Sequence, residues 1–440
     1  MSSEREFLLR CKRAAAVAGL FAVACMGPAI PLEAATATPY GQEFVRLGRE
    51  WHDGLPAGGR GQGATEAALA EVSYKRLVTE SEIHGGPYAD ALAEPLAALA
   101  RHRRGQGDLE RAERLYRRAL HVVRVNDGLY SKRQIPILRE LLDTYRAAGD
   151  LTTLDERYEY FFRLYGRGEP PYSDVRMRAA LEYLRWQREA VRRDLDGKDN
   201  RRLLDLYELN DELLQAVAAD TAADPQWYRQ LCMSQLRNLY LIQDRVQPKL
   251  QNSSAPPSVP IFASDWGEKD SKLMRLEGIQ RGAVGQGVRL LEDLLARDDG
   301  ASVEERARLH LELADWYQWN GSEHRAAEHY GAVVQQLDRA GQHGTMEDWL
   351  GKPVELPDNG AFWQPATVGE GERRVIVAAR YDVTSRGRAK NIHIHVKQEE
   401  DEGVAVTLRR QLARTRFRPL YTDGQAADYA ALAREYVLID

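Results

Sequence analysis

The chain has few cysteines, which limits the ways in which it can be stabilised. Cys11, Cys25 and Cys232 are its three thiols in 440 residues. We expect the first two to leave with an N-terminal leader, so the mature chain would hold one thiol and no internal disulfide. Cys232 falls in the apolar-periodic stretch Gln226–Leu241, which indicates a buried structural cysteine and not a nucleophile.

An excess of basic residues is also missing. The chain has 61 Lys and Arg against 66 Asp and Glu, for a net charge of −5. A nucleic-acid binder shows a clear basic excess, so we expect no nucleic-acid partner. The apolar content of 43% is too high for a disordered chain, and the length suggests two or three domains.

The apolar run at the N-terminus, Ala14–Met26, is short of the roughly 20 residues that span a bilayer. Basic residues precede it and small residues follow it, as in a secretory signal peptide: Arg10, Lys12 and Arg13, then Ala35-Thr36-Ala37. We therefore predict a signal peptide over residues 1–37 and export to the periplasm. Two alternatives stay open. Residues 14–32 could be retained as an inner-membrane anchor, or Cys25 could be lipidated, and the protein would contact a membrane only in those cases.

Motifs for catalysis are missing too. The chain has no His-Glu-x-x-His, Gly-x-Ser-x-Gly or Cys-x-x-Cys sequence. His393 and His395 share one face of an expected strand, but no third ligand accompanies them, so we interpret them as a half-exposed polar face. We predict no catalytic residue, no metal and no cofactor, and hence no enzyme; an enzyme with an undetected site remains an alternative.

What the sequence does contain is a repeated pattern of paired helices. Small residues recur where two helices would cross and large residues where they would interlock, on either side of a glycine turn. The first copy has Leu96, Leu99, Ala100, Gly107, Asp108, Ala112, Tyr116 and Ala119, and the late copy has Leu313, Ala314, Tyr317, Gly321, Ala326, Tyr330 and Val333. This pattern resembles the tetratricopeptide repeat over roughly residues 88–340, with an irregular spacing. The resemblance implies a groove-bearing helical solenoid that holds other proteins.

The pattern divides the chain into segments. We predict helical repeats over 38–250, a Ser- and Pro-rich linker over 251–268, and a further helical repeat over 269–345. Within these, Thr153 with Glu156 and Ser302 with Glu305 have the spacing of capping boxes. Tyr317 and Trp319 stand near the end of the first helix of the late repeat. Tyr317 falls on the core face, whereas Trp319 could belong either to the core or to a ligand platform.

The last segment, 346–440, changes character. Arg373–Thr384, Asn391–Lys397 and Tyr429–Ile439 alternate like strands, and Glu402–Arg416 has a helical pattern. This β-β-α-β unit, with Phe417, Pro419 and Gly424 after the helix, resembles the C-terminal domain of TonB-type energy transducers. We expect it to fold on its own. The predicted fold class is thus mainly α: an irregular TPR-like solenoid followed by a small α+β, TonB-like domain.

Two binding surfaces follow from these resemblances. In tetratricopeptide repeats the first helix of each pair lines the groove, which here carries Arg101, Arg104, Arg139, Asp143 and Arg146. Such arginines would favour acidic or extended peptide segments, although a solvated helix face explains them as well. The last strand, with Tyr429, Ala433 and Tyr436, is the predicted edge for addition of a partner strand.

The function that we predict from these features is a non-enzymatic protein–protein interaction scaffold in the periplasm of a Gram-negative bacterium. The alternative is a membrane-anchored component of TonB-type energy transduction whose tail engages an outer-membrane receptor.

Overall fold

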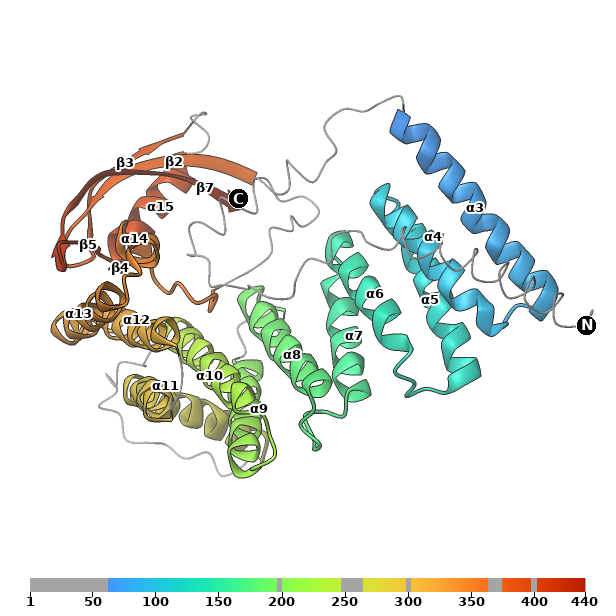
Figure 1. Cartoon of the computed structure of the whole chain (residues 1–440), viewed down its shortest axis with the longest axis horizontal. Helices are drawn as coiled ribbons and strands as arrows, with labels where there is room; N and C mark the ends of the chain where they lie inside the picture. Colours follow the sequence, from blue (N-terminus) through green and yellow to red (C-terminus); the bar gives the residue numbers. More distant parts are fainter. Residues whose placement is uncertain are drawn as a thin grey trace, which may run out of the picture. The chain divides into compact units, whose positions relative to one another are not determined.

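A computed structural model of the chain describes residues 62–195, 200–246, 264–297, 302–362, 374–396 and 402–439. The predicted signal peptide, residues 1–37, lies outside this part. The described residues form thirteen α-helices, α3 to α15, and a small set of strands near the C-terminus (Figure 1). The coarse prediction of a mainly helical chain with a small C-terminal region of strands is therefore confirmed. None of the helices in the described ranges is long and apolar enough to cross a membrane.

The first helices follow one another as antiparallel pairs joined by glycine turns. They are α3 (Gln62–Gly85), α4 (Ala93–Gly105), α5 (Leu109–Asp127), α6 (Gln134–Ala148) and α7 (Leu151–Leu164), with a 3-10 turn at Asp90–Leu92. Gly107 and Gly149 adopt positive φ at the two turns. The residue after each of them caps the next helix, since Asp108 and Asp150 accept hydrogen bonds from backbone N–H groups three residues on. The capping box predicted at Thr153 is therefore wrong, because α7 starts two residues earlier.

Four further helices continue the array: α8 (Asp174–Arg192), α9 (Arg201–Ala219), α10 (Pro225–Arg245) and α11 (Ser264–Ala296). The predicted linker over 251–268 fits only in part. Residues 251–263 lie outside the described part of the chain, and residues 264–268 belong to α11.

The late repeat consists of α12 (Val303–Trp319) and α13 (Glu323–Arg339), followed by α14 (His343–Leu350). The capping box of Ser302 and Glu305 is present as predicted. A short helix at α14 was not predicted, and it runs across the boundary that the sequence placed between 345 and 346.

The small residues of the repeat pattern lie where helices cross. Ala112 and Ala326 are almost completely buried, as are Tyr116 and Tyr330 one turn further along. At a third crossing, a Cβ atom on Gly287 would lie 2.4 Å from the Trp316 ring, so α11 and α12 approach too closely there for any side chain. Close packing of this kind stabilises each helix only through its neighbours.

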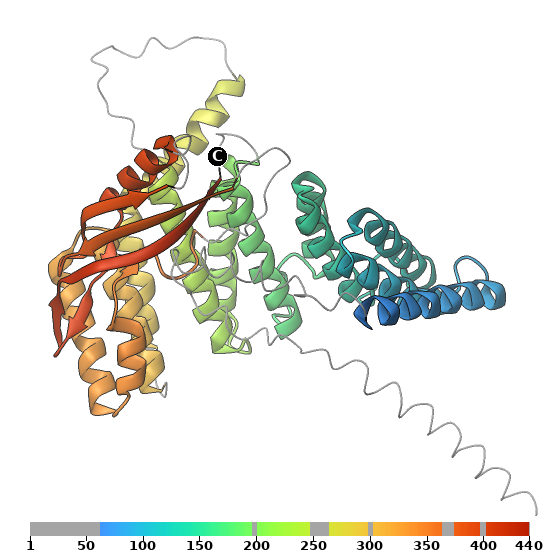
Figure 2. The same ribbon diagram turned by 90° about the horizontal axis from the view of Figure 1, so that it is seen from above.

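The C-terminal strands form a three-stranded antiparallel sheet in the order β3-β2-β7, drawn in red and orange in Figure 2. Its members are β2 (Arg374–Val383), β3 (Ala389–His395) and β7 (Tyr429–Ile439). Helix α15 (Glu402–Arg414) packs Leu408 and Leu412 against the alternating apolar residues of β2. Short strands accompany the sheet: β1 (Val354–Glu355) pairs with β4 (Phe417–Arg418), and β5 (Leu420–Thr422) with β6 (Gln425–Ala427).

The C-terminal region is attached to the late repeat by a buried contact. The Gln318 side chain on α12 donates to the carbonyl oxygens of Arg386 and Phe417, at 2.8 and 3.1 Å. Gly387 lies in this contact with φ +67°, and a Cβ atom there would stand 2.0 Å from the Phe417 carbonyl oxygen. The turn before β3 therefore needs glycine for two reasons, its positive φ and its close approach to β4.

Candidate partner-binding site

The predicted groove arginines lie on the first helices of their pairs, and each reaches a carboxylate on the next first helix. Arg101 and Arg104 on α4 pair with Glu140 on α6, at 3.1 and 2.9 Å. Arg104 also lies 3.6 Å from the exposed Asp143 carboxylate. Arg139 and Arg146 on α6 pair in the same way with Glu182 and Glu189 on α8.

These ion pairs change what the arginines can do. These carboxylates offset part of the positive charge that was expected to attract an acidic partner, and the ion pairs join one repeat to the next. A partly exposed pair such as Arg101 with Glu140 contributes only about 0–1 kcal/mol to stability, whereas Glu189, the partner of Arg146, is buried. Binding of an acidic segment by these arginines stays a prediction. Such a segment would have to compete with the carboxylates of this chain that already pair with them.

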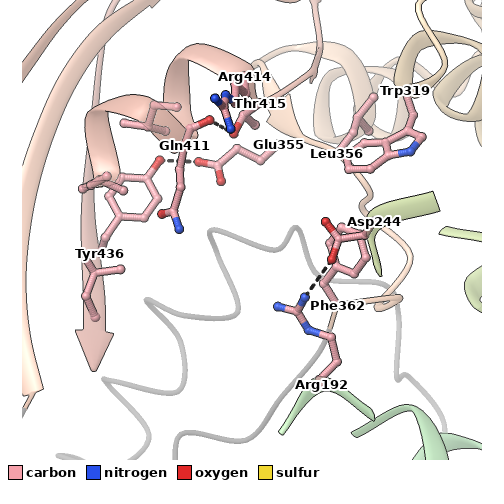
Figure 3. A pocket seen from close by; sticks show the side chains of 13 residues that line it. Arg192, Asp244, Trp319, Glu355, Leu356, Phe362, Gln411, Arg414, Thr415 and Tyr436 are labelled. Carbon is pink, nitrogen blue, oxygen red and sulfur yellow. Dashed lines mark hydrogen bonds and ion pairs between the residues drawn. The ribbon is translucent and has the colours of Figure 1, made fainter. Parts of the chain in front are cut away.

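A cavity of about 430 Å³ lies between the terminal sheet and the helical repeats. One wall comes from Leu408, Gln411 and Leu412 on α15 and from Tyr436 and Leu438 on β7. The other comes from Trp319 and Phe362, with Arg192 on α8 and Asp244 on α10. In Figure 3, the pair of Arg192 and Asp244 faces the cavity beside Phe362.

The predicted strand-addition residues all lie on β7, but their side chains are buried to different extents. Tyr436 is buried and lines the cavity, Ala433 is exposed, and Tyr429 is partly buried. Among the residues that the structure describes, β7 pairs with β2 on one side only, so it forms an edge of the sheet. Edge strands carry backbone groups that can pair with another chain. Tyr436 is therefore part of the cavity wall, while the backbone of β7 forms the edge.

Glu355 of β1 contacts the inner face of the sheet close to this edge. Its carboxylate accepts hydrogen bonds from Tyr436 and Tyr381, the latter at 3.1 Å, and pairs with Arg434 at 2.9 Å. Burial and the Glu355 charge together raise the pKa of both tyrosines, so each stays protonated and donates. The cavity wall formed by Tyr436 is thus fixed in position by a charged network that is itself buried.

A second buried network joins the tail to the late repeat. Arg418 of β4 pairs with Asp315 of α12 at 2.5 Å and with Asp358 at 3.0 Å, and Tyr330 of α13 donates to Asp315. Burial alone would lower the pKa of Arg418, but the two carboxylates raise it above its usual value. Burial also raises the pKa of Asp358 to about 7, against the opposing effect of Arg418.

The residues that the sequence raised as candidates for metal or nucleophilic chemistry can be placed in the structure. No group of three or more His, Cys, Asp or Glu side chains in the described ranges could hold a metal ion. His393 and His395 are exposed on β3. Cys232 is buried, and burial raises the pKa of its thiol to about 12, which leaves almost no thiolate near neutral pH.

Several residues of the site had no signal in the sequence. Phe362 and Glu355 come from a short irregular stretch without periodicity. Arg192 and Asp244 come from helices with many charged residues, and no sequence pattern distinguishes these two from the others. Trp319, which sequence analysis left ambiguous, lines the cavity. Comparison with protein-family models and with curated protein sequences finds none that matches this chain.

Proposed function

We propose that this chain is a non-enzymatic interaction scaffold of the Gram-negative periplasm, which binds an extended segment of a partner protein along β7. The helical repeats are then of the tetratricopeptide type and carry the tail, and the tail is a TonB-like domain that takes the partner strand. The observation that carries this proposal is the position of the β7 edge beside a cavity lined by Trp319 and Phe362.

Both elements of an extended-peptide site are present at this place. A β7 edge offers main-chain hydrogen bonds along a strand, and an adjoining cavity offers space for a side chain of that strand. The other sheet edge, β3, contributes no residue to the cavity, whereas β7 contributes Tyr436 and Leu438. The two edges therefore provide a test and its internal control.

The test is site-specific photo-crosslinking in a periplasmic extract of the native host. A benzoylphenylalanine replaces Ala433 on β7 in one sample and His393 on β3 in the other; both side chains are exposed. We expect the β7 position to crosslink a polypeptide and the β3 position to give little of it. Equal crosslinking from both edges, or none from β7, would contradict the proposal.

Export is tested separately by the mass of the protein purified from its host. The proposal predicts a chain that begins at Thr38. A chain that retains residues 14–32 supports instead the membrane-anchored energy-transduction component.

A further inference from the structure

Arg188 is a buried cation without an anionic partner. It lies on α8 with 6% of its surface exposed. Its Nη1 donates to Ser234 Oγ at 2.9 Å and to Asn238 Oδ1 at 3.1 Å, both on α10 and both neutral. Within the described ranges no carboxylate forms an ion pair with Arg188, and both of its side-chain hydrogen bonds are made through Nη1, which leaves the Nε–Nη2 edge of the guanidinium for another group.

This situation differs from that of the other buried arginines. Arg418 has two carboxylates and Arg434 has one. A guanidinium taken out of water without a counter-ion costs several kcal/mol, so chains seldom keep one without a use for it. Hydrogen bonds to a hydroxyl and an amide satisfy two N–H groups but leave the charge uncompensated.

The surroundings of Arg188 add to its positive potential. Burial is the largest cause that lowers the pKa of Arg188. The charges of Arg237 on α10 and Arg185 on α8 lower it further. Arg237 donates through Nε to the Asn359 carbonyl oxygen at 2.6 Å, so the cluster adjoins the segment that carries Phe362. One turn beyond Arg188 on α8, Arg192 lines the cavity.

We propose that Arg188 is the carboxylate-recognition point of this protein. Its Nε–Nη2 edge would bind a carboxylate of the polypeptide partner through two parallel hydrogen bonds, next to the cavity that accepts the rest of the segment. This inference rests on the proposed function and deepens it: the partner is a peptide segment that carries an acidic side chain or a free C-terminus. The arginines of α4 and α6 are less suited to this purpose, because each of them already pairs with a carboxylate of the next first helix.

The test uses three fluorescent peptides of the same length and the full mature chain. The first has an acidic side chain and a free C-terminus, the second has the acidic side chain and an amidated end, and the third has Asn and an amidated end. Fluorescence anisotropy gives the Kd of each for wild type, Arg188→Met and Arg188→Lys. Arg178→Met is the matched control, because Arg178 is an exposed residue of the same helix.

We expect wild type and Arg178→Met to bind at least one carboxylate peptide tenfold or more tightly than the third peptide. Arg188→Met should lose that preference while melting no lower than wild type, since it removes an uncompensated buried charge. Arg188→Lys should keep the charge but lose part of the preference, because ammonium cannot form the two-pronged contact. The first two peptides show whether the side chain or the C-terminus supplies the carboxylate.

Two results would overturn the proposal: no preference for carboxylate in wild type, or the same preference in Arg188→Met. A lower melting temperature of Arg188→Met with unchanged preference would assign Arg188 a purely structural role. Each of these results leaves the proposed function standing if the β7 crosslink is found, so the two failures can be told apart.

Discussion

At the scale of single residues, Arg418 is a buried cation that pairs with two buried carboxylates. It is almost fully buried between Asp315 and Asp358 and is the cation that compensates both. Replacement of Arg418 by Met should therefore cost about 3–5 kcal/mol, because two buried carboxylates lose their partner. Urea unfolding of Arg418→Met against Arg410→Met, an exposed arginine of α15, measures the difference. Equal losses in the two variants would show that the network contributes nothing.

The same network makes stability depend on pH in an unusual direction. The pKa of Asp358 is raised to about 7 by burial, with Asp315 and Glu312 adding to the rise and Arg418 and Arg308 opposing it. Between the usual value of 3.8 and about 7, the folded chain therefore holds a proton that the unfolded chain has lost. This group consequently adds stability as the pH falls from 7 toward 4, at up to about 1.4 kcal/mol per pH unit.

Asp358→Asn removes this dependence. We expect wild type to gain about 2 kcal/mol relative to Asp358→Asn between pH 8 and pH 5, measured as free energy of unfolding in urea. The partly buried His310 and His329, whose pKa values burial lowers, act in the opposite sense, but both proteins share them. A difference between wild type and variant that stays constant over this range would refute the assignment.

At the scale of elements, the junction of tail and repeat depends on one glycine. Gly387 and Gly424 both have positive φ, but a Cβ atom on Gly387 would overlap the Phe417 carbonyl, whereas on Gly424 it would meet only Val334 at 3.7 Å. Gly424→Ala should thus cost about 1–3 kcal/mol from the backbone alone. Gly387→Ala should cost clearly more, as thermal melts of the two variants would reveal. If they melt together, the close approach of this turn to β4 is not real.

The elements themselves were largely predictable, and the reason is their periodicity. The range of β7 agrees with the sequence-based prediction and α15 ends two residues before its predicted end, because both segments have a regular apolar pattern. Helix α14 and strand β1 were missed, since segments of eight and two residues are too short to show a period.

The candidate site was less predictable than the elements. The motif of Phe417, Pro419 and Gly424 gave no reason to single out Arg418, and nothing marked Asp315 among the polar residues of α12 as its partner. These two residues are about a hundred positions apart, and their contact depends on how the tail packs on the late repeat. The groove arginines were placed on the right helices, but their pairing with carboxylates of the next helix was not foreseen.

At the scale of the whole molecule, the buried contacts alter the expectation that residues 347–440 fold alone. A fragment that begins there lacks Asp315 and Gln318, and leaves Arg418 with Asp358 as its remaining carboxylate. We now expect residues 302–440 to give a cooperative thermal transition and residues 347–440 to give a weaker one or none. Circular dichroism melts of the two fragments decide this. A 347–440 fragment as stable as the longer one would mean that α12 contributes nothing to the tail.

We propose that a partner segment adds to β7 as a strand, in the plane of the terminal sheet. The most direct measurement takes the peptide crosslinked at position 433 and compares its affinity with that of the same peptide N-methylated at alternate residues. N-methylation removes main-chain donors but leaves the side chains unchanged, so strand addition predicts at least a tenfold loss in one of the two methylation registers and a much smaller loss in the other. Equal affinity of the methylated and unmethylated peptides would contradict the claim.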